Sequence, residues 1–243
     1  MRTLLIWLLI PLWLWALTAA EIIEKSEDLL RGESAWGIYE MRISSPRFER
    51  ALVMESWAEG TRRSFIRILE PRRDAGTTFL KLDNELWQFV PRIERTIKVP
   101  PSMMLQQWMG SDFTNDDMVR ESSLASDYTA EIFDENATGW QIALSPKADA
   151  AVVWGRIEVA IAKAGFLPLE QHFYDDKGER IRTITFEAVR EMDGRTLPTR
   201  WRVTPRTPDK AGHETVLTIR EATFDRPLPE DIFTLRSLRS YSR

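Results

Sequence analysis

The sequence predicts a mainly β protein built around one large antiparallel sheet that curls into a barrel or a sandwich. Apolar and polar residues alternate with period two in many short segments, and Gly, Pro, Asn and Asp separate these segments. Helical periodicity is confined to a few places. Short, evenly spaced strands of this kind are typical of sandwiches and barrels, and we expect about ten or eleven of them. The alternation covers residues 36–43, 51–58, 63–69, 77–82, 85–90, 96–99, 127–133, 138–144, 151–161, 169–174, 180–187, 197–203 and 214–224.

The N-terminal segment has the pattern of a secretory signal peptide. A single basic residue precedes the apolar run Leu4–Leu17, and small residues end at Ala20, where we expect cleavage. Residues 1–20 would then be removed, and 21–243 would form one domain that works outside the cytoplasm. A retained membrane anchor is the alternative, although the run is shorter than the roughly 20 residues of a spanning helix.

The first elements of the predicted domain are one helix and a series of hairpins. Residues 21–31 place apolar side chains at positions i, i+7 and i+8 among charges, which predicts an amphipathic helix ending at Gly32. In the strands that follow, alternation puts Leu52 and Met54 on one face and Trp57 on the other. Further along, Asp83-Asn84 has the spacing of a two-residue hairpin turn.

The stretch from Pro100 to Phe113 is unusual because it concentrates methionine and aromatic side chains between two sets of strands. Ser102 can cap a short helix over 103–109, and Thr114 can cap a second helix, where Asp116 and Asp117 favour the N-terminus. Methionine side chains adapt to irregular apolar partners. The stretch is therefore either an ordinary helix that plugs the end of the sheet or a lid that contacts a lipid-like ligand through Met103, Met104, Leu105, Trp108 and Met109.

Composition and spacing argue against most catalytic and nucleic-acid-binding functions. The chain has a net charge of −4, no cysteine and two histidines. No concentrated basic face, HExxH, GxSxG, phosphate-binding loop or cluster of metal ligands is present in the sequence. We expect turn or cap roles for Asp116-Asp117 and Asp175-Asp176, and structural or surface roles for His172 and His213. The expectation is a protein that is not an enzyme and has no catalytic residue, metal, cofactor or nucleic-acid partner.

Three motifs follow one another in the middle of the sequence. They are Leu86-Trp87-Gln88-Phe89-Val90-Pro91, then Arg95-Thr96-Ile97, and then Met109-Gly110-Ser111-Asp112-Phe113-Thr114 with Asp116-Asp117-Met118. This block resembles the signature of the outer-membrane lipoprotein-sorting protein family, the LolA-like periplasmic proteins, and the layout matches over most of Trp36 to Leu238. Asn115 departs from the family pattern, which often has an aromatic residue there.

The resemblance implies an incomplete, strongly curved antiparallel β-barrel whose helices form a lid over a hydrophobic cavity. It also implies a periplasmic carrier that shields the acyl chains of a lipoprotein or other lipid and moves them toward the outer membrane. An inner-membrane transporter would be the donor and an outer-membrane protein the acceptor. The alternative is a non-transporting sensor or interaction module of the same fold, which binds lipoproteins or an envelope-stress partner.

Candidate lipid contacts are apolar positions of the strands and the lid. Because a one-residue slip exchanges the two faces of a strand, register decides which of them face a cavity. Arg92 and Arg95 belong to a group of arginines ahead of the lid. They either form a basic rim for anionic headgroups or an acidic partner, or simply face solvent. The candidate contacts are Met54, Phe65, Phe79, Leu86, Phe89, Met103, Leu105, Trp108 and Phe113.

Overall fold

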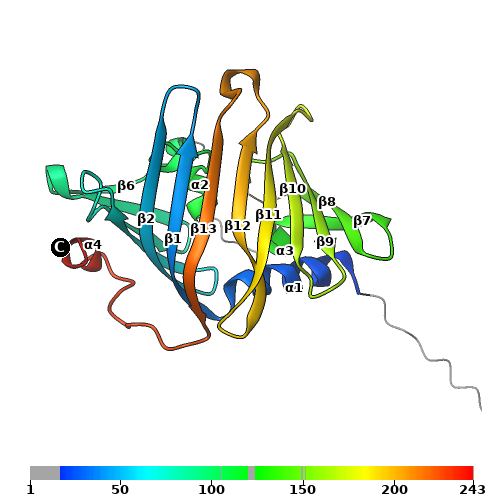
Figure 1. The fold of residues 1–243 in the computed structure, drawn as a ribbon, viewed down its shortest axis with the longest axis horizontal. Coiled ribbons are helices and arrows are strands. Elements are labelled where there is room, and N and C mark those ends of the chain that lie inside the picture. The colour runs from blue at the N-terminus through cyan, green and yellow to red at the C-terminus, as the bar shows by residue number, and fades with distance from the viewer. Residues whose placement is uncertain (1–16, 105, 120–123, 149, 151, 243) are drawn as a thin grey trace, which may run out of the picture.

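The computed structural model describes residues 17–104, 106–119, 124–148, 150 and 152–242, and these contain one open, curved sheet of thirteen strands (Figure 1). The mainly β class is confirmed. The expected strand number was too low, because every alternating segment contains a strand, even the shortest one at an edge. The strands are β1 (Ser34–Ser44), β2 (Glu49–Glu59), β3 (Arg63–Glu70), β4 (Thr78–Leu82), β5 (Glu85–Val90), β6 (Arg95–Lys98), β7 (Tyr128–Glu135), β8 (Gly139–Pro146), β9 (Arg156–Ala162), β10 (Pro168–Tyr174), β11 (Arg180–Met192), β12 (Arg195–Pro205) and β13 (Glu214–Phe224).

Two meanders make up this sheet. Strands β1 to β6 pair in chain order, strands β7 to β13 do the same, and β1 pairs with β13 to join the two sets. All neighbours are antiparallel. The two edge strands are β6 and β7, which follow one another along the chain. The connection between them, residues 99–127, therefore has to cross a face of the sheet, and we call it the crossing segment.

Register separates the apolar side chains into two sets. Leu52 and Met54 join the main core on the face that we call the inner face, which the crossing segment and an N-terminal helix cover. Trp57 points to the opposite, outer face, together with Phe65 and Phe89. The expected division of β2 into two faces is confirmed, because β2 pairs with β1 without a bulge between Ser34 and Ser44.

The N-terminal helix, α1 (Ala19–Arg31), ends where the sequence predicts but begins two residues earlier than the expected start at residue 21. Thr18 and Glu21 form a capping box at its start, and Gly32 ends it with φ at 65°. Ile22 and Ile23 are fully buried in the main core. Much of the expected signal peptide, residues 1–16, lies outside the described residues. No helix in the described part of the chain is long and apolar enough to cross a bilayer.

The crossing segment contains short turns where the sequence predicts a helix over 103–109, and that expectation was wrong. Residues Pro101–Met103 (η2) and Trp108–Gly110 (η3) form 3₁₀ turns, and Met109 has a left-handed φ of 51°. The Trp108 ring is 1% exposed and lies 5.1 Å from the Phe79 ring. The Ser111 hydroxyl donates to the Trp108 carbonyl at 2.7 Å. Burial of this large ring and the hydroxyl cap favour a tight turn over a regular helix.

Two short helices follow within the crossing segment, α2 (Asn115–Val119) and α3 (Leu124–Asp127). The Thr114 hydroxyl accepts from the Asp117 amide at 3.1 Å, which confirms the predicted cap. In return the Asp117 carboxylate accepts from the Thr114 amide at 2.7 Å. This reciprocal pair fixes where α2 begins, and so fixes the position of Asp117.

The C-terminal segment covers part of the outer face. Leu238, in helix α4 (Ser237–Ser240), is fully buried, and its carbonyl accepts from the Thr78 hydroxyl at 2.7 Å. The Tyr241 ring meets Trp57 and Phe65 edge-on. Figure 1 shows α4 at the C-terminus, beside the β6 side of the sheet. The outer-face aromatic cluster is therefore a second core and is closed by the chain itself.

Candidate functional site

A cavity of about 310 Å³ lies between the inner face and the elements that cover it. This volume is at the lower end of the range for small-molecule sites, about 300 to 1,000 Å³. Strands from both meanders contribute to its wall, so the cavity spans the junction of β1 and β13. Its lining is mostly apolar and includes Leu30, Ala35, Tyr39, Met41, Met54, Ala58, Ile66, Phe113, Met118, Leu124, Tyr128, Val152, Trp154, Ile157, Phe173, Ile184, Phe186, Trp201 and Leu217.

Cross-strand pairing brings the wall residues together. Tyr39 on β1 is opposite Met54 on β2, and Met41 is opposite Leu217 on β13. Leu217 is in turn opposite Trp201 on β12. Side chains directly opposite each other on one face lie about 4.5 to 5.5 Å apart at Cβ. The sheet register therefore creates a continuous apolar wall from residues that are distant in the sequence.

The roof of the cavity comes from α1 and from the crossing segment. Leu30 of α1, Phe113 before α2, Met118 in α2 and Leu124 in α3 all line it. Helices α2 and α3 of this roof are short, with five and four residues, whereas α1 has thirteen residues and is anchored in the main core by Ile22 and Ile23.

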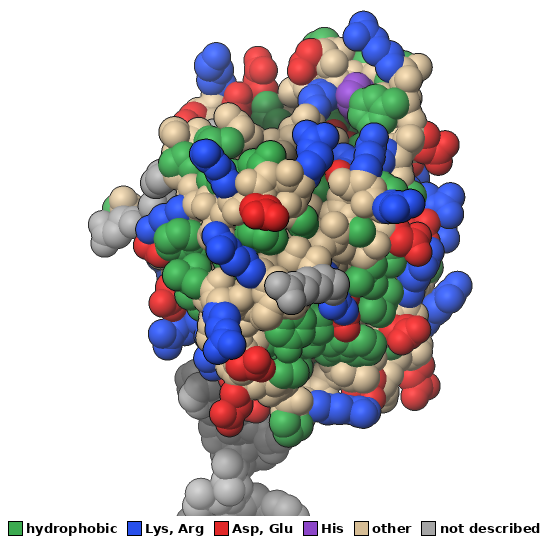
Figure 2. Space-filling view, turned by 90° about the vertical axis from the view of Figure 1, so that its left-hand side faces the viewer, with side chains coloured by type: hydrophobic (Ala, Val, Ile, Leu, Met, Phe, Trp, Pro, Cys, Tyr) green, Lys and Arg blue, Asp and Glu red, His purple; other side chains and the backbone are tan. Residues whose placement is uncertain are grey.

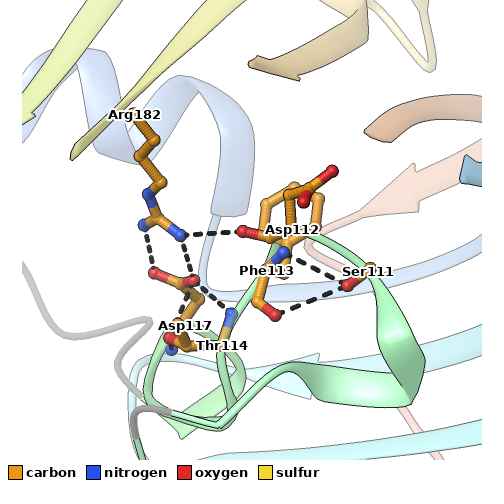
Figure 3. A network of polar contacts seen from close by, with 6 residues as sticks. All are labelled: Ser111, Asp112, Phe113, Thr114, Asp117 and Arg182. Carbon is orange, nitrogen blue, oxygen red and sulfur yellow. Dashed lines mark hydrogen bonds and ion pairs between the residues drawn. The ribbon is translucent and has the colours of Figure 1, made fainter. Parts of the chain in front are cut away.

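An ion pair joins this roof to the sheet. Arg182 of β11 holds the Asp117 carboxylate of α2 with both terminal nitrogens, Nη1 at 2.6 Å and Nη2 at 2.5 Å (Figure 3). Arg182 Nη1 also donates to the Asp112 carbonyl at 3.3 Å. A two-pronged pair of this kind fixes orientation as well as distance. It therefore sets where α2 lies over the cavity.

The Arg182 guanidinium is enclosed by aromatic rings of the cavity lining. Its carbon lies 4.6 Å from the Trp154 ring centre and 4.3 Å from that of Phe173. The residue is 3% exposed, and its Nε is buried without a hydrogen-bond acceptor among the described residues. Such stacking stabilises a cation, but the Nε–H donor of Arg182 stays unused.

The Asp117 carboxylate is held in its charged form. Burial acts to raise its pKa, but the charge and hydrogen bonds of Arg182 outweigh this effect, and the Thr114 amide and hydroxyl add to them. The net result is a pKa below the ordinary value for aspartate. The ion pair therefore persists at neutral pH.

Two of the nine predicted lipid contacts line the cavity, Met54 and Phe113. Phe79, Leu86 and Trp108 belong to the same core but do not line the cavity. Met103 is 38% exposed, and Leu105 lies outside the described residues. Whether any of these residues binds lipid stays a prediction.

The candidate contacts Phe65 and Phe89 do not lie on the inner face. Both belong to the outer-face cluster, under the C-terminal segment. Side chains on β3 and β5 alternate between the two faces as predicted, but it is Ile66 on β3 and Leu86 on β5 that face the inner core. Both phases of these strands are apolar, so alternation by itself does not distinguish the face that adjoins the cavity.

Arg92 and Arg95 do not form a rim of this cavity. They are exposed at the turn between β5 and β6, at an edge of the sheet, whereas the lining strands are β1 to β3, β7 and β9 to β13. Figure 2 views the molecule from this side and shows Lys and Arg side chains interspersed with acidic and hydrophobic ones. Any electrostatic role of these two arginines would be separate from the cavity mouth.

Sequence reasoning missed Arg182 and the lining residues of the second meander. Arg182 shares the period-two phase of Ile184 and Phe186, which both line the cavity. The sequence signal that could have identified Arg182 is a positively charged residue at a position where the strand's alternation predicts an apolar one. Trp154 was missed for another reason, since the strand expected from residue 151 begins only at Arg156 and Trp154 lies on the loop before it.

The polar residues considered for catalysis take structural positions. Asp175 accepts from the amides of Lys177 and Glu179 in a hairpin turn, as predicted. His172 lies on β10, where its Nδ1 is 3.1 Å from the Thr183 hydroxyl, and His213 lies in the loop before β13. Among the described residues no group of three or more His, Asp or Glu is arranged to hold a metal ion.

Comparison with known proteins agrees with this geometry at the level of the fold. A family model described as an uncharacterized protein matches residues 60–240, and no curated protein matches the chain. A DUF1329 family protein from Desulfovibrio piger is 18% identical over 90% of this chain and 97% of its own, with a TM-score of 0.81.

Two further solved structures share the fold over 91% of this chain, each with a TM-score of 0.77. A LolA superfamily protein from Nitrosomonas europaea is 22% identical and is covered over its whole length. A Vibrio parahaemolyticus domain described as an outer membrane lipoprotein-sorting protein is 18% identical, with 98% of it covered. The chain thus belongs to the family of uncharacterized proteins whose model spans residues 60–240, and it has the fold of the LolA superfamily.

Proposed function

We propose that this protein is a periplasmic carrier that binds acyl chains of a lipoprotein or another lipid in the cavity of its inner face. The observation that supports this best is the cavity itself, whose wall is mostly apolar and whose roof includes the short helices α2 and α3. An acyl chain in such a site leaves water at a gain of about 0.8 kcal/mol per buried CH₂.

The N-terminal pattern and the fold support the remainder of the proposal. The signal-like residues 1–20 would direct export, and the LolA-like fold is shared with a domain described as lipoprotein-sorting. A carrier needs modest net affinity so that cargo can leave. A roof that packs back onto the empty wall provides this, because closure buries part of the apolar surface that the departing cargo uncovers. Donor and acceptor would be membrane components on either side of the periplasm.

Filling the cavity tests this proposal directly. Ser56 of β2 lines the cavity. Ser56→Phe places a ring in the cavity, and Phe is a residue that strands favour. Ala51 lies on the same strand with its side chain exposed on the outer face, so Ala51→Phe is a matched control. We expect Ser56→Phe to weaken binding of an uncharged acyl ligand at least about tenfold, with Ala51→Phe unchanged.

The readouts are displacement of an apolar fluorescent probe by 1-monooleoylglycerol and transfer of that lipid from loaded protein to acceptor vesicles. Equal binding by both variants would contradict the proposal. Tight binding without transfer to vesicles would favour the alternative, a sensor or interaction module that retains its ligand.

A further inference from the structure

We infer that the cavity selects uncharged acyl groups, such as acyl esters, and discriminates against the ionised carboxylate of a free fatty acid. This inference rests on the proposed function, because it names the ligand class for the same cavity. The observations that support it are the charged residues that line the cavity and the hydrogen bonds that Arg182 makes.

Among the described residues, the charged side chains that line the cavity are three carboxylates and two cations. The cations are Arg31 and Arg182, and the carboxylates are Glu27, Asp117 and Asp127. Arg31 Nη2 is 3.9 Å from Glu27 Oε1, so one cation already lies beside an acidic group. A ligand carboxylate would bring a further negative charge close to these carboxylates. Like charges at such a site oppose binding.

Arg182 is the enclosed cation to which a fatty-acid carboxylate would bind, and Asp117 already balances its charge. Nη1 and Nη2 both donate to Asp117, at 2.6 and 2.5 Å. A ligand carboxylate would either displace Asp117, which leaves that carboxylate buried without its cation, or share Arg182 with it, which places two carboxylates beside one cation. An uncompensated buried charge is among the most costly changes a protein can undergo. The protein's own carboxylate thus competes with the ligand's.

The Nε–H group of Arg182 is available to donate a hydrogen bond to a neutral oxygen of the ligand. Its Nε is buried and has no acceptor among the described residues, while the guanidinium lies against Trp154 and Phe173 of the lining. An ester carbonyl accepts a hydrogen bond and adds no charge. An ester carbonyl that accepts from Nε leaves both bonds from Arg182 to Asp117 in place. An acyl ester can therefore bind without disturbing the ion pair between Arg182 and Asp117.

Competition between two lipids with the same chain tests the inference. Displacement of an uncharged fluorescent probe is measured with 1-monooleoylglycerol and with oleate at pH 8, at concentrations below those at which either lipid aggregates. We expect the wild-type protein to bind the ester at least about tenfold more tightly. Comparable binding of the two lipids would overturn the inference and leave the carrier proposal standing. Failure of both to bind would overturn the carrier proposal as well.

A variant of Asp117 gives the second arm. Asp117→Asn removes the competing charge and leaves Arg182 as a partly satisfied cation, so the ratio of oleate affinity to ester affinity should rise about tenfold. Asp209→Asn removes the same charge at an exposed position of the loop before β13 and should change neither affinity. A parallel change for both lipids in Asp117→Asn would contradict a charge-based selection. The wild-type comparison stands independently of how well this variant folds.

Discussion

At the scale of single residues, the Arg182–Asp117 pair matters for stability as well as for the cavity. Arg182 is almost completely buried, so its removal leaves Asp117 as an uncompensated charge. We expect Arg182→Met to lower the free energy of unfolding by roughly 3 to 5 kcal/mol. The double variant Arg182→Met with Asp117→Leu should be more stable than the single one, because it removes both charges. Urea unfolding measures both, and a double variant less stable than the single one would contradict this explanation.

The same pair predicts a dependence of stability on acid. The pKa of Asp117 is lower in the folded protein than its ordinary value of 3.8. Its ionised form therefore stabilises the fold above that pH, and this contribution is lost as the pH falls through the lowered folded-state pKa. The difference in unfolding free energy between wild type and Asp117→Asn should be constant from about pH 5 to 7, where the carboxylate is ionised in both the folded and the unfolded chain. This difference in unfolding free energy should shrink as the pH falls below the ordinary pKa of aspartate. A difference that stays constant into strong acid would show that Asp117 is not the titrating group.

At the scale of elements, the two faces of the sheet should respond differently to mutation. Phe89 packs in the outer-face cluster under the C-terminal segment, and the Arg239 guanidinium lies 5.7 Å from its ring centre. Phe89→Asp removes a large buried side chain and buries a charge, so we expect a loss of about 3 kcal/mol or more in stability. Lipid affinity of the folded fraction should not change. Thermal unfolding and probe displacement on the same sample separate the two effects, and loss of binding without loss of stability would place Phe89 at the cavity after all.

Helix α1 gives a prediction about processing. Cleavage after Ala20 would remove Thr18 of the capping box and Ala19, but Ile22 and Ile23 would keep their places in the main core. Loss of one N-cap costs about 1 kcal/mol, which the buried isoleucines can offset. N-terminal sequencing of protein exported to the periplasm should therefore begin at Glu21. Protein that retains Met1 would indicate a membrane anchor.

At the scale of the whole molecule, much of the sheet could be predicted from the sequence because its signals are local. The alternation of β2 and the Asp83-Asn84 turn each depend on neighbouring residues, and both are confirmed. Helix α1 was predictable for the same reason, since its charges and Gly32 lie next to its apolar face. The mainly β class thus needed no knowledge of long-range contacts.

The candidate site could not be predicted to the same extent, because its parts meet only through the topology. Arg182 and Asp117 are 65 positions apart, and the local sequence around each does not identify the other as its partner. The β1–β13 pairing joins the two meanders and places Met41 opposite Leu217, far along the chain. Apolar residues on both phases of β3 and β5 left the inner face ambiguous. The crossing segment was misjudged because Trp108 packs on Phe79 and the turn adapts to it.

Both proposals require that an acyl chain lies between the inner face and its roof, and a crystal structure of the protein with a brominated monoacylglycerol is the sharpest test. We expect anomalous bromine signal inside the cavity, against Met54 and Leu217 of the wall and Phe113 of the roof. The glycerol ester should lie toward Arg182, with the Arg182–Asp117 pair intact. Bromine signal confined to the outer surface, with the cavity filled by its own side chains, would show that the inner face does not hold the lipid.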